Sequence, residues 1–325
     1  MSGSSNEIFL KMLRYLKGSR FLQNLFVALF VLIAVQIFTI GVLSEQLPIE
    51  VAKPYYYDSK SFVFEPRETL AIDNVDGSIN VITSPRTKIL VNAEVKGYPR
   101  RFKDREKVLK FAKTLFQVIE SEKRISIETE PRSRPEGVEF RVDYQIYVPL
   151  KINLEINTIS GGNITVDKGC KDIYIRANRS DIFIDGPLGQ VNVQTILGRV
   201  DIREIIADSE IQTINGSIYL TGAKGKLKAN SINGNVQLTI LSEEVQSCDI
   251  SVTNGNITIG LPELYDGLIS ARTHRGYILS DFQLGEIAPG SQVRQVEYQR
   301  GQPKLILKLS TMNGKILISR LIQES

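Results

Sequence analysis

Residue types that usually carry out catalysis or bind metals are scarce in this 325-residue chain. It contains one histidine, His274, and two cysteines, Cys170 and Cys248. A zinc site needs three or four protein ligands, so one histidine cannot build such a site by itself. The sequence has no Gly-Lys-Ser/Thr phosphate loop and no Gly-X-Ser-X-Gly nucleophile elbow. We therefore predict no catalytic, cofactor-binding or metal-binding residue.

Aspartates repeated at turns would point to calcium, as in the nonapeptide calcium β-roll. The corresponding turns here read GGNITV, LGRVDI and NGSIYL, without a repeated aspartate. Asp167, Asp185 and Asp201 are scattered with respect to these turns. The sequence therefore does not favour structural calcium.

Carboxylates with lysine and arginine could still serve a polysaccharide lyase or glycosidase, because such enzymes need no histidine. Those enzymes form a cleft from long loops inserted at the turns of a β-helix. The nine-residue step from Gly162 to Leu238 leaves no room for such a loop. Room exists only after Leu238, around Glu263–Gly267 and Glu286–Gly301. A carbohydrate-active β-helix enzyme is thus an alternative that depends on these later loops.

The elements that would position any site come from a repeat. A phrase of glycine, any residue, an apolar residue, any residue and a second apolar or small residue recurs at nine-residue steps. Alternation with period two predicts strands, and Asn-Gly pairs predict turns. The predicted core residues are Ile164, Ile182, Val200, Ile218 and Val236 in one column, and Val166, Ile184, Ile202, Leu220 and Leu238 in the next. The predicted turn glycines are Gly77, Gly162, Gly198, Gly216, Gly234, Gly255 and Gly314.

The step length predicts how the chain winds. Nine residues at about 3.3 Å each cannot circle a packed core, so two units should make one coil of eighteen residues. Stacked coils would then bury the two columns without long-range contacts. The predicted fold is an all-β, single-stranded β-solenoid (β-helix) with about 18 residues per coil.

One amphipathic helix is predicted to interrupt the strands, at about residues 104–122. Its apolar stripe is formed by Val108, Leu109, Phe111, Ala112, Leu115, Phe116 and Ile119. We expect it to cover one end or flank of the solenoid, where strand edges would otherwise pair with another molecule. A helix that binds a partner is the alternative.

The N-terminal region predicts a membrane anchor. Phe21–Leu43 is 23 residues without a charge, long enough to cross about 30 Å of hydrocarbon. Basic residues precede it, which places the N-terminus in the cytoplasm and the body outside it, in the periplasm or at the cell surface. A cleaved signal peptide is the alternative, although the apolar run is long for one. The predicted parts are a leader (1–20), a transmembrane helix (21–43), a linker (44–60) and the solenoid (61–325).

The placement of charge excludes a nucleic-acid-binding surface, and the placement of the cysteines excludes a disulfide between them. The net charge is +4, and +3 of it falls in the first twenty residues, so the remainder is close to neutral. A nucleic-acid-binding surface would need clustered lysine and arginine beyond the leader. Cys170 and Cys248 would lie about four coils, or about 19 Å, apart, whereas a disulfide needs Cα atoms within about 7 Å. We therefore predict two free thiols and no nucleic-acid partner.

The order of the strand phrases is similar to that of one bacterial family. VDYQIYVPL (Val142–Leu150) is followed by LEINTISGGNITV and then by repeated NGxIxL phrases. This order resembles the family of β-strand-repeat domains of unknown function labelled "putative adhesin", from about Ser61 to the C-terminus. The resemblance implies a β-helical body, a helix between early and later strands, and an envelope location.

Three functional hypotheses follow. The leading one is a non-enzymatic, membrane-anchored module that presents a repeated surface for adhesion, envelope scaffolding or sensing. Its ligand would be an envelope glycan or protein, bound by outward polar residues such as Asn163, Thr165, Tyr174, Arg176, Asn192, Gln194, Tyr219, Gln237 and Thr258. The alternatives are the carbohydrate-active enzyme and an accessory to a membrane stress-sensing system. Outward residues of any soluble sheet are polar, so the polar array alone does not decide among them.

Overall fold

The computed structural model describes residues 53–129, 136–241 and 245–321. The chain divides into two compact units, residues 1–53 and 54–325. The predicted leader and transmembrane helix lie outside the described residues. Among the residues that are described, no helix is long and apolar enough to cross a membrane.

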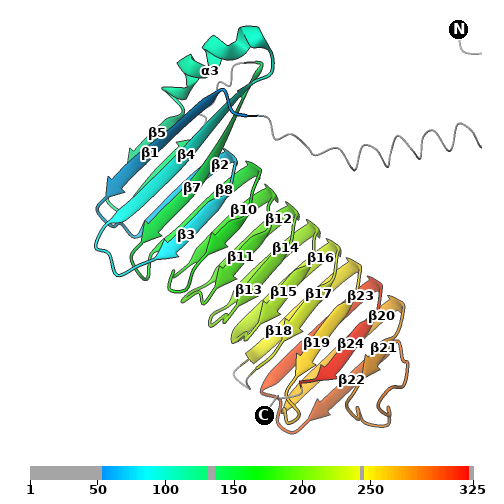
Figure 1. The fold of residues 1–325 in the computed structure, drawn as a ribbon. Helices are drawn as coiled ribbons and strands as arrows, with labels where there is room; N and C mark the ends of the chain where they lie inside the picture. The colour runs from blue at the N-terminus through cyan, green and yellow to red at the C-terminus, as the bar shows by residue number, and fades with distance from the viewer. Residues whose placement is uncertain (1–52, 130–135, 242–244, 322–325) are drawn as a thin grey trace, which may run out of the picture. The chain divides into compact units, whose positions relative to one another are not determined.

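The described strands of the second unit form two twelve-stranded sheets (Figure 1). Sheet A contains, in spatial order, β1 (Tyr56–Phe64), β4 (Ile89–Pro99), β7 (Val138–Val148), β3 (Ile79–Thr83), β9 (Ile164–Val166), β11 (Ile182–Asp185), β13 (Val200–Arg203), β15 (Ile218–Thr221), β17 (Val236–Thr239), β19 (Ile257–Leu261), β24 (Ile316–Arg320) and β21 (Ile278–Ser280). Sheet B contains β22 (Gln295–Arg300), β20 (Gly267–Arg275), β23 (Leu305–Asn313), β18 (Val245–Asn254), β16 (Gly225–Asn233), β14 (Ser209–Asn215), β12 (Val191–Leu197), β10 (Ile173–Arg179), β8 (Asn153–Ser160), β2 (Thr69–Asp76), β6 (Arg124–Thr129) and β5 (Phe116–Glu120).

Each coil of the central part contributes one strand to each sheet. Parallel pairing sets Ile182 opposite Val200 and Val200 opposite Ile218 in sheet A. In sheet B, Val191 lies opposite Ser209. Each of these steps is eighteen residues, the coil length that the sequence predicts. The fold is therefore all-β, with repeated parallel strands wound as a solenoid.

The core lies between the two sheets and runs through every coil. The ten predicted core residues all lie on sheet A strands, and none is more than 2% exposed. Sheet B closes the core from the other side with Ile173, Ile175, Val193, Ile211 and Ile250. Burying an aliphatic side chain of this size stabilises the fold by about 1.5–3 kcal/mol. The solenoid is thus held together locally, coil upon coil.

The turn glycines are required for two different reasons. Gly77, Gly198 and Gly255 have φ values of 124°, 126° and 152°, which side chains rarely adopt. Gly216 and Gly234 lie outside that region, but a Cβ on either would clash with the carbonyl oxygen of the glycine one coil below. Positive φ therefore accounts for only part of the set. Close stacking of turns accounts for the rest.

The predicted helix is shorter than expected. A 3-10 turn, η1 (Phe102–Asp104), leads into α3 (Arg105–Ala112), and the chain then forms strand β5. The prediction of a helix to residue 122 was wrong because FQVIE is rich in aromatic and β-branched residues and finds an antiparallel partner in β6. Leu109 and Ile119, placed on the buried stripe by the sequence, are 43% and 45% exposed.

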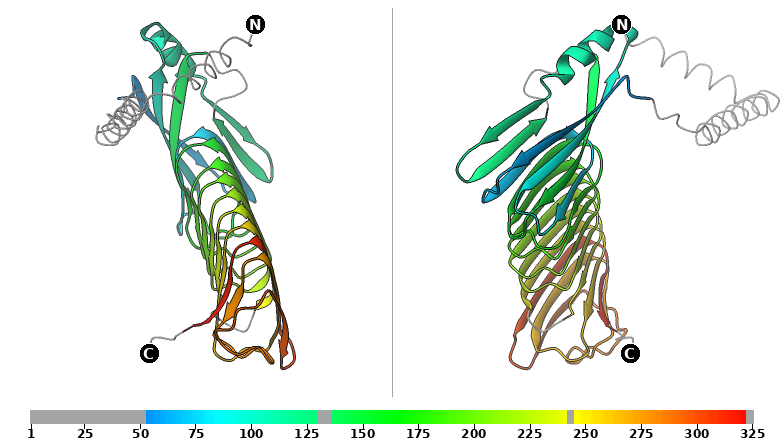
Figure 2. Two further views of the ribbon diagram at one scale, coloured as in Figure 1. Left: turned by 90° about the vertical axis from the view of Figure 1, so that its right-hand side faces the viewer. Right: turned by 60° about the vertical axis from the view of Figure 1, so that its left-hand side comes forward.

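The helix still covers one end of the stack, as predicted. Val108, Ala112 and Leu115 are buried, and the ring of Phe111 lies 5.7 Å from that of Phe140 on β7. Gly97 on β4 provides the space that Val108 fills. The hairpin of β5 and β6 extends from the same end, as the right-hand view of Figure 2 shows.

Chain order and spatial order differ at the other end. The last strands of the chain, β23 and β24, lie between β18/β19 and β20/β21. Asn313 of this last coil continues a ladder of side-chain amides, because its Nδ2 donates to Asn254 Oδ1 at 2.7 Å. Asn254 donates in turn to Asn233, and Asn233 donates to Asn215, each at 2.8 Å. The amide ladder thus continues without a break into the last coil.

Candidate binding groove

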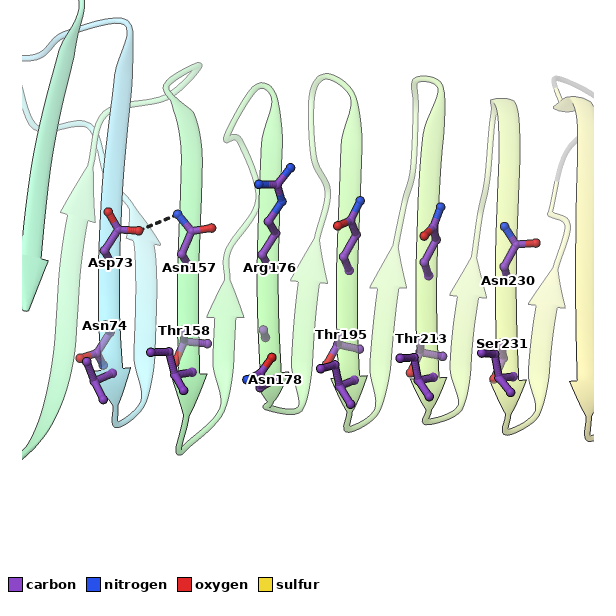
Figure 3. Close-up of a pocket in the computed structure, with 18 of the residues that line it drawn as sticks. Asp73, Asn74, Asn157, Thr158, Arg176, Asn178, Thr195, Thr213, Asn230 and Ser231 are labelled. Atoms are coloured by element: carbon purple, nitrogen blue, oxygen red, sulfur yellow. Dashed lines mark hydrogen bonds between the residues drawn. The ribbon is translucent and has the colours of Figure 1, made fainter. Parts of the chain in front are cut away.

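A groove of about 860 Å³ crosses the outward face of sheet B from β6 to β18, and Figure 3 shows most of the residues that line it. On β6 it is lined by Glu128, in register with Asp73, and by Thr129. Two parallel rows of outward side chains line it, one residue per strand in each row. The amide row consists of Asp73, Asn157, Arg176, Gln194, Gln212, Asn230 and Ser251. The apolar row consists of Val75, Ile159, Asn178, Ile196, Ile214, Ile232 and Thr253, and the strand register continues it to Met312.

A row of small hydroxyl residues explains why the isoleucines face outward. Thr195, Thr213 and Ser231 point inward and are 4% exposed, so the next residue must point out. Two of the hydroxyls donate to carbonyl groups of the turns, Thr195 Oγ1 to Leu197 O at 3.1 Å and Ser231 Oγ to Gly216 O at 3.1 Å, whereas the buried Thr213 hydroxyl has no partner among the described residues. The hydroxyl row thus fits the corner of the coil and turns each following isoleucine towards solvent.

The apolar row is unusually exposed for aliphatic side chains. Ile196 and Ile214 are each 41% exposed, Ile232 is 46% exposed, and Ile159 is 58% exposed. Strand pairing places these side chains on successive or nearby strands, so their exposed surfaces are neighbours rather than scattered. Contiguous exposed apolar surface beside polar residues is typical of an interaction site.

The amide row supplies hydrogen-bonding groups and one free cation. Asn157 Nδ2 donates to Asp73 Oδ1 at 2.6 Å, as the dashed line in Figure 3 shows. Arg176, two strands from Asp73, has no hydrogen-bond or ion-pair partner among the described residues. A guanidinium in this position can bind a carboxylate or another acceptor of a partner.

A third outward row lies beside the amide row and carries most of the charge. We call it the charged row: Glu155, Tyr174, Asn192, Glu210, Lys228, Asp249 and Lys308. Lys228 Nζ and Gln212 Nε2 each lie 2.8 Å from Glu210 Oε1, and these two hydrogen bonds lower the pKa of Glu210. Arg124 pairs with Glu155 at 2.5 Å. The charged row thus has both signs along its length.

The structure divides the outward polar residues singled out from the sequence. Arg176 and Gln194 line the groove, whereas Tyr174 and Asn192 border a neighbouring hollow of about 380 Å³. Thr165, Tyr219, Gln237 and Thr258 lie on strands of sheet A, and Asn163 precedes β9.

The apolar row was not predicted from the sequence. Its signal was the phrase Thr/Ser-Ile/Met-X-Gly at 158–161, 195–198, 213–216, 231–234 and 311–314, where the isoleucine or methionine is out of phase with the core.

The later loops, which the enzymatic alternative requires, form a separate pocket of about 320 Å³. Its described lining contains one carboxylate, Glu263, which pairs with Arg320 at 3.0 Å. Tyr265 lies beneath Arg300, whose guanidinium carbon is 5.7 Å from the ring centre, and burial raises the pKa of Tyr265 to about 12. Glu286 and Glu297 are not among the described residues that line this pocket. The pair of carboxylates used in glycoside hydrolysis is therefore not brought together there.

The remaining titratable candidates have structural surroundings. Cys170 and Cys248 are buried free thiols, and burial raises the pKa of each to about 12. Asp201 pairs with Arg199 at 2.6 Å, and Asp185 lies 3.8 Å from Lys168. His274 is exposed on β20. Within residues 53–129, 136–241 and 245–321, no three His, Cys, Asp or Glu side chains are grouped to hold a metal ion.

Comparisons with known proteins point to one family. The family model described as Toastrack DUF4097 matches residues 68–319. No curated protein is significantly similar to the chain.

Solved structures give weaker similarities. One is a "putative adhesin" from Bacteroides fragilis NCTC 9343, 13% identical, covering 82% of this chain and 97% of that chain with a TM-score of 0.44. Another is a "putative cell adhesion protein" from Clostridium sporogenes ATCC 15579, 13% identical, covering 82% of this chain and 100% of that chain with a TM-score of 0.23.

Proposed function

The chain belongs to the Toastrack DUF4097 family, and we propose that it is a non-enzymatic binding module that presents the outward face of sheet B to a partner. The role would be adhesion, envelope scaffolding or sensing. One observation carries the proposal: four half-exposed isoleucines of the apolar row lie beside the amide row on four of the five strands from β8 to β16. Such a surface costs solubility unless something covers it.

The solenoid suits this role because it holds the rows rigidly. Each strand is hydrogen-bonded to the strands of the coils above and below, so the side chains keep a fixed spacing of about 4.8 Å. A partner that matches this spacing does not have to order the surface when it binds, which lowers the entropic cost of association. Rigid repetition therefore supports binding over a long contact.

The chemistry of the groove favours a protein partner over a glycan. Its described lining contains aliphatic side chains, amides, hydroxyls and the charged Asp73, Glu128 and Arg176, but no aromatic ring. Four half-exposed isoleucines gain most from apolar side chains of a partner. An envelope glycan that uses only the amide row is the second possibility. A nucleic acid is not proposed, because the solenoid sequence is close to neutral.

The location belongs to the same proposal. Phe21–Leu43 would anchor the chain in a membrane with the N-terminus in the cytoplasm and the solenoid outside it. The support is the length of the uncharged run and the basic residues before it. The solenoid would then face the periplasm or the cell surface.

A binding experiment with a matched pair of variants tests the proposed surface. Labelled full-length chain in detergent is titrated onto isolated envelopes, prepared from cells that make the protein and from cells that lack it. Gln194→Lys places a charge in the groove, whereas Gln237→Lys makes the same change on the outward face of sheet A, at a residue that is also exposed. We expect saturable binding that Gln194→Lys weakens at least about tenfold and Gln237→Lys leaves unchanged.

Two outcomes would contradict the proposal. One is equal loss of binding in both variants, because the surface of sheet B would then have no special role. The other is saturable release of reducing ends from an envelope glycan by the purified chain, which would favour the enzymatic alternative.

A further inference from the structure

The apolar row is symmetric in sequence about its central strand. Counting outward from Ile214 on β14, the neighbours are Ile196 and Ile232, then the polar Asn178 and Thr253, then Ile159 and Met312. Apolar and polar positions therefore match up to three strands on either side of β14, whereas the fourth pair sets Val75 against His274. A surface with this symmetry is complementary to a copy of itself that has been turned end over end.

The spacing between strands limits which kinds of partner can contact every coil. Strands repeat every 4.7–4.9 Å across a sheet, whereas side chains on one face of an extended peptide repeat about every 6.7 Å. An extended peptide laid across the strands would therefore fall out of step after two or three coils. A second stacked sheet has the same repeat and can contact every coil.

Charge decides between the two ways of placing a second sheet on the first. The strand register continues the amide row through Ser310 to Arg272 on β20. A two-fold axis that runs along the stack over the amide row would place each strand on its own copy, so Asp73 would face Asp73 and Arg272 would face Arg272. A two-fold axis parallel to the strands, over β14, reverses the order of the coils. Asp73 on β2 and Arg272 on β20 are each four strands from β14, so this axis brings them together.

A second charge pair agrees with the reversed order. Glu155 on β8 and Lys308 on β23 lie in the charged row, each three strands from β14. Arg272 and Lys308 have no ion-pair partner among the described residues, so each is free to pair across an interface. In the second arrangement Asp73 and Glu155 each meet an opposite charge, and the one like pair, Glu210 against its own copy, is offset in each chain by the hydrogen bond from Lys228. In the first arrangement Asp73 and Arg272 each meet their own copies, so charge favours the second.

The area is adequate for a specific contact. Nine strands span about 38 Å across the sheet, and three outward rows give a strip about 15–20 Å wide. The product is on the order of 600–800 Å² per partner, comparable to the roughly 800 Å² that each side of a standard interface buries. The amide row would form its centre, with the apolar row along one edge and the charged row along the other.

We infer that the partner of this face is a second copy of the chain, bound through sheet B with the order of the coils reversed about β14. This inference rests on the proposed function and names its partner. Each chain enters its solenoid at β1, the terminal strand of sheet A, so the reversed order puts the two β1 strands at opposite ends of the pair. With the membrane anchor proposed above, the pair would join two molecules that are anchored in facing surfaces. It would not join two neighbours that are anchored in the same surface.

Cross-linking tests the geometry directly, because the two natural cysteines are buried. The full-length chain is treated in detergent with a short bis-maleimide and run on a denaturing gel. Ile214→Cys should form a covalent dimer by itself. Ile196→Cys and Ile232→Cys should cross-link at least about fivefold more when mixed than either does alone. Ile206→Cys, at a residue 45% exposed outside the groove, is the matched control and should remain monomeric.

A charge exchange tests the register independently. Asp73→Arg and Arg272→Asp should each weaken self-association about tenfold, because like charges would then meet twice in the pair. A mixture of the two variants should regain the affinity, because both contacts again join opposite charges. Sedimentation velocity measures all three samples, and equal melting temperatures verify that the variants are folded.

Several results would overturn the inference. They are a wild-type chain that stays monomeric at tens of micromolar, self-linking of Ile196→Cys as strong as in the mixture, and a mixture of charge variants that fails to recover. The envelope titration separates this failure from failure of the proposed function. Self-pairing requires binding only to envelopes that contain the protein, whereas binding to envelopes that lack it would keep the docking surface and replace its partner.

Discussion

At the scale of single residues, the direction of a side chain decides its role in this protein. Neighbouring residues on one strand point to opposite faces of the sheet. In β15, Ile218 is buried and Tyr219 is partly exposed. Tyr219 receives the guanidinium of Arg199, 4.1 Å from its ring centre, on the outer face of sheet A. On sheet B the same alternation buries Thr213 and exposes Ile214. A hydrophobic residue is therefore structural in one register and available for binding in the other.

Substitution of adjacent residues on β15 tests this alternation. Ile218→Asp removes packing worth about 2–5 kcal/mol and buries a carboxylate, so we expect the solenoid to unfold. Tyr219→Asp loses a surface contact of about 0.5–1 kcal/mol and should fold. Thermal melting of the full-length chain measures both variants. Equal melting temperatures would show that the inward and outward assignment is wrong.

At the scale of elements, the end strands need partners that are distant in sequence. β23 hydrogen-bonds to β18 on one side and to β20 on the other, and β24 does the same between β19 and β21. The last coil is thus an internal coil, and β22 closes the edge of β20 in the antiparallel sense. β5 and β6 give the opposite end a comparable hairpin.

A truncation after Arg300 tests the position of the last coil. It removes β23 and β24 and leaves the facing edges of β18 and β20 unpaired, so we expect loss of structure back to about residue 245. A control truncation after Leu321 keeps both strands and should leave the fold intact. Hydrogen exchange of residues 245–280 reports the difference. Continued protection of these residues after the first truncation would contradict the observed strand order.

At the scale of the whole solenoid, the eighteen-residue register makes coils interchangeable. Each coil contacts mainly the coils above and below it, so stability is close to a sum over neighbouring pairs. The same regularity aligns the apolar, amide and charged rows into one face. Stability and the proposed docking surface therefore have one structural cause.

Deletion of a whole coil tests this interchangeability. Removal of residues 199–216 joins Gly198 to Ser217 and restores the turn phrase, so we expect a folded chain one coil shorter. Removal of residues 199–207 deletes half a coil and brings a sheet B strand to a sheet A position. Circular dichroism and limited proteolysis should show a folded product only for the first deletion. Two equally folded products would mean that half-coils, not coils, are the structural unit.

The sequence by itself determined the coil and its core, because alternation, Asn-Gly turns and an eighteen-residue repeat are short-range signals that act within one coil and on its neighbour. Ile164, Val200 and Ile218 could be assigned to the interior in this way. Three features depended on tertiary structure: strand β5 in place of the end of a helix, the insertion of β23 and β24, and the exposed row around Ile214. Each depends on which edge or face a distant segment occupies, and hydrogen bonds between distant edges leave no periodic signal in the chain. The proposed docking face therefore depends on the stacking of coils, whereas the stack itself is encoded locally.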